Sequence, residues 1–155
     1  MSVSIIVPTD KKEIEECLDS LFSQKHPVYF EVIVVETPKF NFEIDSVCQK
    51  YRCTHLVVDN VGLTKAWQMA ILGAKFDLIG ITQKKVDKNW IQTISDTFKR
   101  FPYFGILDTG PIAFHKRIWH QQGGANCEAN EIEFKEIAAK MGHPGILKIG
   151  ELCHQ

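Results

Sequence analysis

The chain has 155 residues, of which 45% are hydrophobic and 24% charged, a composition that excludes a disordered or fibrous protein and suits one globular domain. Lysine and arginine together number 18 against 19 aspartates and glutamates, and the formal net charge of -1 gives no electrostatic reason to expect nucleic acid as a partner. No apolar run approaches the roughly 18 residues that cross a bilayer. The first residues lead directly into a strand-like run instead of a signal peptide, so we expect no transmembrane segment and a soluble, cytoplasmic protein.

The opening stretch, Ser2 to Thr9, predicts a strand buried on both faces, because β-branched and apolar residues follow one another without alternation. Pro8 is expected to end this strand, since it has no amide hydrogen for the ladder. Thr9 and Asp10 are favourable N-cap residues for the helix that follows. A loop at the carboxyl end of a buried parallel strand is where open α/β sheets bind ligands, so Pro8 to Asp10 should line any small-molecule site.

The rest of the chain alternates between short β-rich runs and segments of helical periodicity. Strands are expected at Phe30–Glu36, Thr54–Val58, Leu78–Thr82, Gly105–Asp108, Gly110–Phe114 and Ile146–Ile149. Helices are expected at Lys11–Lys25, Phe42–Tyr51, Thr64–Lys75, Trp90–Phe101 and Glu128–Met141, with a helical turn at His115–Trp119. This rhythm predicts one α/β domain over residues 1–155, with a mostly parallel central sheet flanked by helices and right-handed crossovers.

The five cysteines are an odd number and contain no CxxC pair. This pattern favours reduced, mostly buried thiols over a metal or disulfide framework.

Six segments, taken together in their order and spacing, resemble the family 2 glycosyltransferases of the GT-A fold. The matching segments are residues 3–9, 16–24, 31–36, 60–66, 110–124 and 130–134. The resemblance spans nearly the whole chain and implies a GT-A fold that binds a nucleoside-diphosphate sugar. The join from Phe101 to Gly110 is shorter than in the family, which suggests that much of the usual acceptor platform is missing.

The resemblance also implies which residues hold the nucleotide. In the family, the first-strand loop and an acid at the end of the second strand bind the base and ribose, which correspond to Pro8, Thr9 and Glu36 here. An alternative for Glu36 is an exposed acid at a strand end. Gly62 and Lys65 stand at the start of a helix, where backbone amides and a positive charge favour a phosphate, although Lys65 could equally be a surface lysine.

The largest departure from the family is the loss of its Asp-x-Asp metal motif. The corresponding position falls within Thr82 to Lys84, with no acid before Asp87. Because Mg²⁺ and Mn²⁺ prefer carboxylate ligands, the sequence does not support a divalent cation cofactor. Either Lys84 or Lys85 replaces the cation at the diphosphate, with Thr82 beside it, or catalysis is lost and the lysines form a solvated turn. His154 lies near the family's distal metal histidine and is a weak candidate, since it would be a lone ligand at the end of the chain.

Three further residues correspond to the acceptor side of the family's site. Glu131 falls on the general-base position, but it also belongs to an acidic helix start that the helix dipole favours on its own. Trp119, beside His120, could stack against a sugar or belong to the core. Asp108 could face the acceptor or simply end a strand.

Two functions from different classes remain open at this stage. One is a metal-independent or degenerate glycosyltransferase, inverting if active, that transfers a hexosyl group from a nucleotide sugar (a UDP-sugar as first guess) to an unknown acceptor, with Glu131 as base. The other is a non-catalytic binding or assembly module that holds a partner, another copy or a larger glycosyltransferase. A catalytic protein should bury the turn from Thr82 to Lys85 beside Pro8, Thr9 and Glu36, whereas a scaffold can leave it in solvent.

Overall fold

The computed structural model describes residues 1–9, 14–25, 28–36, 42–58, 63–102, 104–121 and 146–147. The strands are β1 (Val3–Thr9), β2 (Phe30–Glu36), β3 (Thr54–Val57), β4 (Leu78–Ile81), β5 (Ile106–Asp108), β6 (Ile112–His115) and β7 (Ile146–Leu147). The helices are α1 (Glu15–Phe22), α2 (Phe42–Tyr51), α3 (Leu63–Gly73), α4 (Trp90–Arg100) and α5 (Lys116–Gln121). The predicted elements within these residues are confirmed with small shifts at their ends, and the predicted helix Glu128–Met141 lies outside them. None of the helices in the described part of the chain has the length and apolarity needed to span a membrane.

The strands form one sheet in the order β3-β2-β1-β4-β6-β5-β7. Strands β3, β2, β1 and β4 are parallel neighbours, and β6 runs antiparallel to both β4 and β5. The predicted mostly parallel sheet is therefore confirmed, with β6 as the reversed strand. β1 lies at the centre of the parallel part, where Ile5 is paired with Val32 on one side and Gly80 on the other.

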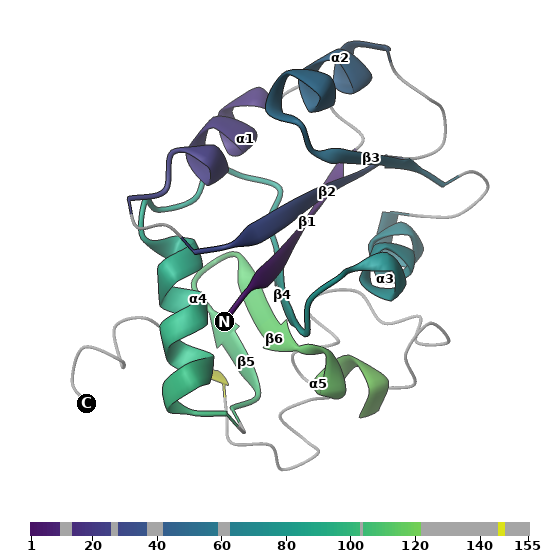
Figure 1. Ribbon diagram of the computed structural model, residues 1–155. Coiled ribbons are helices and arrows are strands. Elements are labelled where there is room, and N and C mark those ends of the chain that lie inside the picture. The colour runs from purple at the N-terminus through teal and green to yellow at the C-terminus, as the bar shows by residue number, and fades with distance from the viewer. Residues whose placement is uncertain are drawn as a thin grey trace.

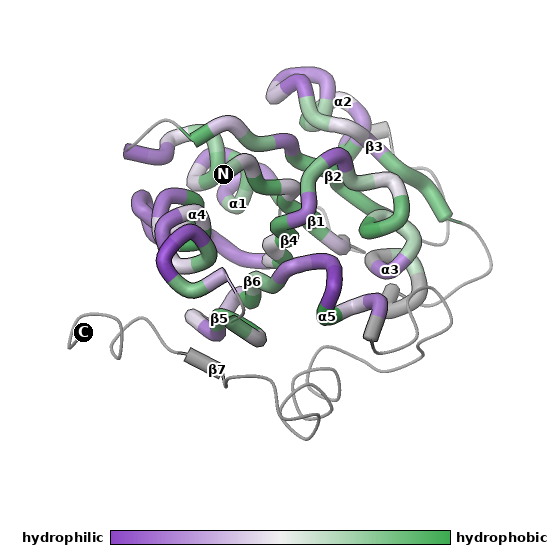
Figure 2. The backbone as a smooth tube through the Cα atoms, turned by 60° about the horizontal axis from the view of Figure 1, so that its bottom comes forward, coloured by the Kyte–Doolittle hydropathy of each residue, from purple (hydrophilic) through white to green (hydrophobic). Residues whose placement is uncertain are grey.

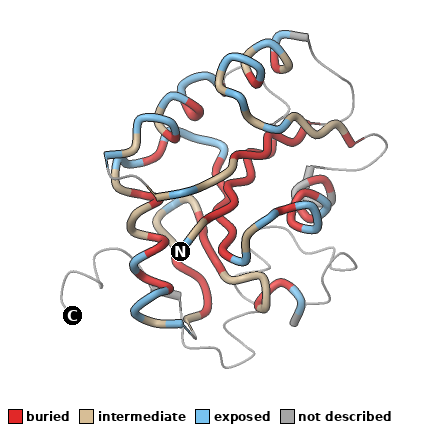
Figure 3. Tube along the Cα trace, in the orientation of Figure 1, coloured by how far each residue is buried: buried red, intermediate tan, exposed pale blue. Residues whose placement is uncertain are grey.

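Helices cover both faces of the sheet (Figure 1). Helices α1, α2 and α4 contribute to one apolar cluster, which also contains Val7, Val34 and Leu78 of the central strands. Helices α3 and α5 contribute to a second cluster on the opposite face, together with Ile6, Val35 and others. The central strands are buried along most of their length (Figure 3), and hydrophobic residues are concentrated in them (Figure 2). Burial on both faces explains why β1 and β2 read as continuous apolar runs.

Two predicted boundaries near the start of the chain need correction. Strand β1 does not stop at Pro8, because Pro8 is still paired with Val35 of β2. Successive residues of a strand direct their backbone groups to opposite neighbours, and Ile6 O accepts from Thr82 N on the β4 side. The nitrogen of Pro8 therefore also faces the β4 side, where the pairing has already ended, so no ladder bond is lost.

Helix α1 is also shorter than predicted. It ends at Phe22, short of the predicted end at Lys25, and it begins at Glu15 with Ile14 in the N-cap position. The expected capping residue Asp10 lies outside the described residues.

Gly80 allows α4 to lie directly against the sheet at the end of β4. A Cβ atom at this position would lie 2.8 Å from Ile5 Cδ1 and 2.9 Å from the Trp90 ring, so any larger residue would require these side chains to shift. Trp90 is 2% exposed, and its Nε1 donates to Thr109 Oγ1 at 3.0 Å. The start of α4, the end of β4 and the turn between β5 and β6 are thus fixed to one another.

Candidate functional site

The carboxyl ends of β1, β2 and β4 lie at one edge of the sheet. Thr9 is paired with Glu36 at the end of β1 and β2, and Thr82 N donates to Ile6 O at 3.1 Å just beyond β4. The structure therefore brings the predicted nucleotide-binding positions Pro8, Thr9, Glu36 and Thr82 to the same edge. This is the edge at which open α/β sheets bind ligands.

A pocket of about 320 Å³ opens at this edge beside the end of β4. Its described lining residues are Ile81, Thr82, Gln83, Lys84, Lys85, Gly110 and Pro111. One wall is the turn after β4 and the other is the turn between β5 and β6. Pro8 is buried and is not among these described lining residues, so its predicted place in a ligand site stays a prediction.

The turn from Thr82 to Lys85 presents two lysines to the pocket. Lys84 N donates to Thr82 Oγ1 at 3.2 Å, and that hydroxyl in turn donates to Lys84 O at 2.9 Å. Thr82 is 4% exposed and its side chain fixes the turn, and its role toward a nucleotide remains a prediction. Lys84 and Lys85 are exposed, and among the residues that the structure describes neither ammonium group forms an ion pair. Their positive charge can therefore be used by an anion in the pocket.

The opposite wall of the pocket is a turn held by its own side chains. Asp108 Oδ1 accepts from Gly110 N at 3.1 Å, and Gly110 has a φ of +92°, which favours glycine. Thr109 Oγ1 donates to Pro111 O at 3.0 Å while it accepts from the Trp90 indole. Asp108 thus stabilises the turn that lines the pocket, and its role toward an acceptor remains a prediction.

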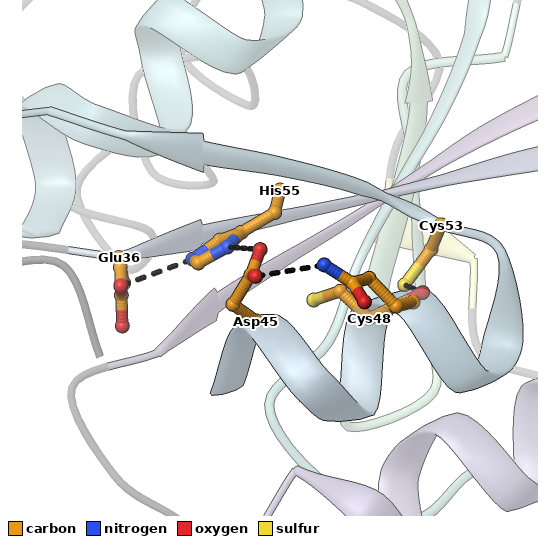
Figure 4. Close-up of polar contacts among 6 residues, drawn as sticks. Glu36, Asp45, Cys48, Cys53 and His55 are labelled. Carbon is orange, nitrogen blue, oxygen red and sulfur yellow. Dashed lines mark hydrogen bonds and ion pairs between the residues drawn. The ribbon is translucent and has the colours of Figure 1, made fainter. Parts of the chain in front are cut away.

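Glu36 belongs to a row of ionisable side chains between β2, β3 and α2 (Figure 4). Its Oε1 atom lies 3.0 Å from His55 Nε2, and His55 Nδ1 lies 2.9 Å from Asp45 Oδ1. Glu36 is 2% exposed, so the alternative of an exposed acid at a strand end is wrong. For both contacts to be hydrogen bonds, either the imidazole carries both N–H hydrogens or one carboxyl group is protonated.

The row continues onto the surface of α2, where Gln49 Nε2 donates to Asp45 Oδ2 at 2.9 Å. We refer to Glu36, His55 and the partly exposed Asp45 as the buried network. Sequence reasoning missed His55 and Asp45, because nothing in the local pattern marks them. The pairing of β2 with β3 could have revealed His55. Glu36 is paired with Val57, and His55, two residues before Val57 on β3, faces the same side of the sheet.

The structure describes only two of the remaining predicted site residues, Trp119 and the backbone of Lys65. Trp119 is 1% exposed within the apolar cluster beneath α3 and α5, which argues against sugar stacking because no ring face is open. Lys65 lies in the first turn of α3, and its side chain is not described. Gly62, Glu131 and His154 lie outside the described residues.

Within the described ranges, no three histidine, cysteine, aspartate or glutamate side chains gather in a way that could hold a metal ion. Asp87 is the acid nearest in sequence to the lysine turn. Its Oδ1 atom accepts from Asn89 N at 2.9 Å, which directs the carboxylate to the start of α4.

Comparison with known proteins supports the fold at the level of structure. No family model and no curated protein matches the sequence. A mannosyltransferase from Pyrobaculum calidifontis, solved with GDP-mannose and Mn²⁺, is similar with a TM-score of 0.75 at 19% identity, over 93% of this chain and 53% of that one. S. aureus TarS 1–349, solved with UDP, has a TM-score of 0.69 at 17% identity, over 95% and 58%. A 4-diphosphocytidyl-2C-methyl-D-erythritol synthase has a TM-score of 0.69 at 12% identity, over 95% and 88%.

These similarities confirm the predicted GT-A fold, which is that of nucleotide-diphospho-sugar transferases. The chain spans about half the length of the mannosyltransferase and somewhat more of the TarS chain. At identities this low the likeness concerns the fold, so it does not by itself assign an activity.

Proposed function

We propose that this chain is a family-2-like glycosyltransferase domain that binds a nucleoside-diphosphate sugar at the carboxyl edge of the sheet, and that Lys84 and Lys85 carry the charge of the diphosphate. The observation that supports this most directly is the pocket beside β4, into which two exposed lysines without ion-pair partners in the described part of the chain project their charge from a fixed turn. The neighbours that bind GDP-mannose or UDP share this fold.

The physical argument rests on the charge that sugar transfer releases. A departing nucleoside diphosphate must be neutralised in the transition state, and positioned positive charges can supply this stabilisation. Lysine ammonium groups are compact point charges that suit phosphate oxygens. In this proposal the two lysines replace an essential metal, Gly62 and Lys65 support the phosphates from the start of α3, and Pro8, Thr9 and the Glu36 region lie toward the nucleotide.

For transfer itself, the proposal keeps Glu131 as the general base that takes the proton of the acceptor hydroxyl, with inversion at the sugar carbon. Replacement Glu131→Gln should then abolish sugar transfer while nucleotide binding remains. Unchanged transfer in this variant would remove Glu131 from the mechanism and leave the donor site intact.

The donor site is tested by calorimetric titration with UDP, GDP and their sugars, in EDTA and in Mn²⁺. We expect binding in EDTA, and at least a tenfold loss of affinity in Lys84→Ala, which corresponds to about 1.4 kcal/mol. Lys99→Ala is the matched control, because Lys99 is an exposed lysine on α4 outside this pocket. Binding that requires Mn²⁺ would contradict the replacement of the metal by lysine.

One observation favours a second candidate, a non-catalytic binding or assembly module on the same fold. Gln83, Lys84 and Lys85 are exposed instead of being covered beside Glu36, which is the arrangement expected of a scaffold. If no nucleotide binds in the titration, this second function replaces the first, and binding partners should then be sought with the intact chain.

A further inference from the structure

Two cysteines meet at the carboxyl end of α2. Cys48 lies in the last turn of the helix, and Cys53 follows it just before β3. The chain reverses at Arg52, which has a φ of +57°, and the helix ends with hydrogen bonds from Arg52 N to Gln49 O at 3.2 Å and from Cys53 N to Cys48 O at 3.0 Å. This pair of bonds is the Schellman helix ending, which folds the second residue after the helix back onto the last turn.

This helix ending brings the Cys53 side chain back against Cys48, and both belong to the same apolar surroundings. Cys53 Sγ lies 3.6 Å from Cys48 O, the backbone oxygen of the other cysteine (Figure 4). Cys48 is 1% exposed, whereas Cys53 is half-buried and reaches solvent. A peroxide can therefore reach Cys53 before Cys48.

Electrostatics assign different roles to the two sulfur atoms. The hydrogen bond from the Cys48 thiol lowers the pKa of Cys53, against the opposing effect of burial. The same contact raises the pKa of Cys48, with further increases from burial and from the negative charge of Asp45 and Glu36. The thiolate is the nucleophilic form of cysteine, so Cys53 is the attacking thiol. Cys17, by contrast, is buried alone, and desolvation raises its pKa to about 12.

We propose that Cys48 and Cys53 form a dithiol that hydroperoxides convert to an intramolecular disulfide, with Cys53 as the peroxide-reactive thiol and Cys48 as the resolving one. In the first step the Cys53 thiolate attacks one peroxide oxygen, the O–O bond breaks, and Cys53 sulfenic acid and hydroxide form. In the second step the Cys48 sulfur attacks the Cys53 sulfur, an S–S bond forms, and water leaves with the sulfenic oxygen. Overall, the two thiols lose two protons and two electrons, and hydrogen peroxide takes them up to become two waters.

The disulfide would join the end of α2 to the start of β3, the two elements that carry Asp45 and His55 of the buried network. The backbone hydrogen bond from Cys53 N to Cys48 O already keeps the two residues next to each other. This modification site is independent of the proposed glycosyltransferase function, and neither proposal depends on the other.

The test treats the full chain with hydrogen peroxide, blocks free thiols by alkylation, and maps the disulfides by mass spectrometry after trypsin. Lys50 and Arg52 separate the two cysteines, so trypsin converts a Cys48–Cys53 disulfide into two cross-linked peptides that dithiothreitol separates. We expect this cross-link to be the principal oxidation product in the wild type and in the matched control Cys17→Ser. The mapped peptides also distinguish it from any bond to Cys127 or Cys153.

The variant Cys48→Ala isolates the first step, since it keeps Cys53 and removes the resolving thiol. Sulfenic acid trapped by dimedone should then accumulate at Cys53. Oxidised wild type that shows no Cys48–Cys53 peptide, or that shows Cys53 unmodified while Cys17 reacts, would overturn the proposal. The wild-type measurement stands alone if the alanine variant fails to fold.

Discussion

The same edge of the sheet carries ionisable groups in two opposite situations. The side chains of Glu36, at the end of β2, and His55, near the start of β3, are almost completely buried, and each has a charged or polar partner within 3.0 Å. At the end of β4, Lys84 and Lys85 are exposed and, in the described part of the chain, have no ion-pair partner. A buried ionisable group depends on its partners for its stability, whereas an exposed one can lose or gain a partner at little cost. We therefore expect the buried network to matter more for the stability of the fold than the lysine turn, whose charges are available to the proposed ligand.

The largest expected effect comes from breaking the buried network. His55→Leu should lower the free energy of unfolding by about 3 to 5 kcal/mol, because it removes the shared partner of two carboxylates. Urea denaturation measures this loss. The reference is the double variant Lys84→Ala/Lys85→Ala, which should change stability by no more than about 0.5 kcal/mol. Similar losses in the free energy of unfolding of His55→Leu and of the double lysine variant would show that the buried network does not stabilise the fold more than the lysine turn.

The second effect concerns the wall of the pocket opposite the lysines. Thr109→Val should cost about 1 to 3 kcal/mol, because it leaves the buried indole N–H of Trp90 without its acceptor. Chemical denaturation measures the cost, and Trp90→Phe together with Thr109→Val completes a double-mutant cycle. Strictly additive losses in that cycle would mean that the Trp90–Thr109 hydrogen bond does not stabilise the turn.

A smaller effect of opposite sign is expected at the end of the helix that carries Asp45. Arg52 is exposed and holds a left-handed conformation that glycine adopts without strain. Arg52→Gly should therefore raise the free energy of unfolding by about 0.5 to 1 kcal/mol. Thermal denaturation measures the gain, and Arg52→Ala serves as control, since it removes the side chain but keeps the strain. An equal gain in the alanine variant would attribute the effect to the side chain.

The smallest effect is a pH dependence at the end of β6. Burial lowers the pKa of His115, the nearby charge of Arg117 lowers it further, and Asp77 partly opposes them. The unfolded chain therefore binds a proton at a higher pH than the folded one, so stability should fall as the pH drops below about 6.5. His115→Asn keeps an acceptor for Arg117 N and should flatten this slope. Since solvent screens the partly exposed His115, the difference should stay well under about 1 kcal/mol, and a steeper slope in the variant would contradict it.

The strands and helices that form the layers of the fold could be predicted from the sequence, because they depend on the spacing of hydrophobic residues along the chain. Buried runs such as that of β2 and the amphipathic pattern of α4 are local properties, and both elements lie close to their predicted bounds. The lysine turn was also accessible, since the missing acids and the adjacent lysines are visible in the chain.

What the sequence did not provide depends on contacts between distant residues. Glu36, Asp45 and His55 come from three different elements, and only the pairing of β2 with β3 brings them together. The residues next to Trp119 in the sequence do not distinguish a core tryptophan from one that stacks against a sugar. Its packing with the apolar cluster on one face of the sheet makes that distinction. Such questions are settled by the whole topology, because no short segment contains both partners.

Pro8 of β1 also affects where the neighbouring strand β4 ends. With Ile6 paired to Ile81, continuation of β4 would set Gln83 beside Pro8, and the missing hydrogen would leave Thr82 O without a donor from β1. The chain after β4 therefore gains little by staying in the sheet, and it leaves as the turn that carries Lys84 and Lys85. The proline ring on β1 thus favours the end of its pairing with β4. The opening at the sheet edge therefore follows from the amino-acid sequence and does not depend on a ligand.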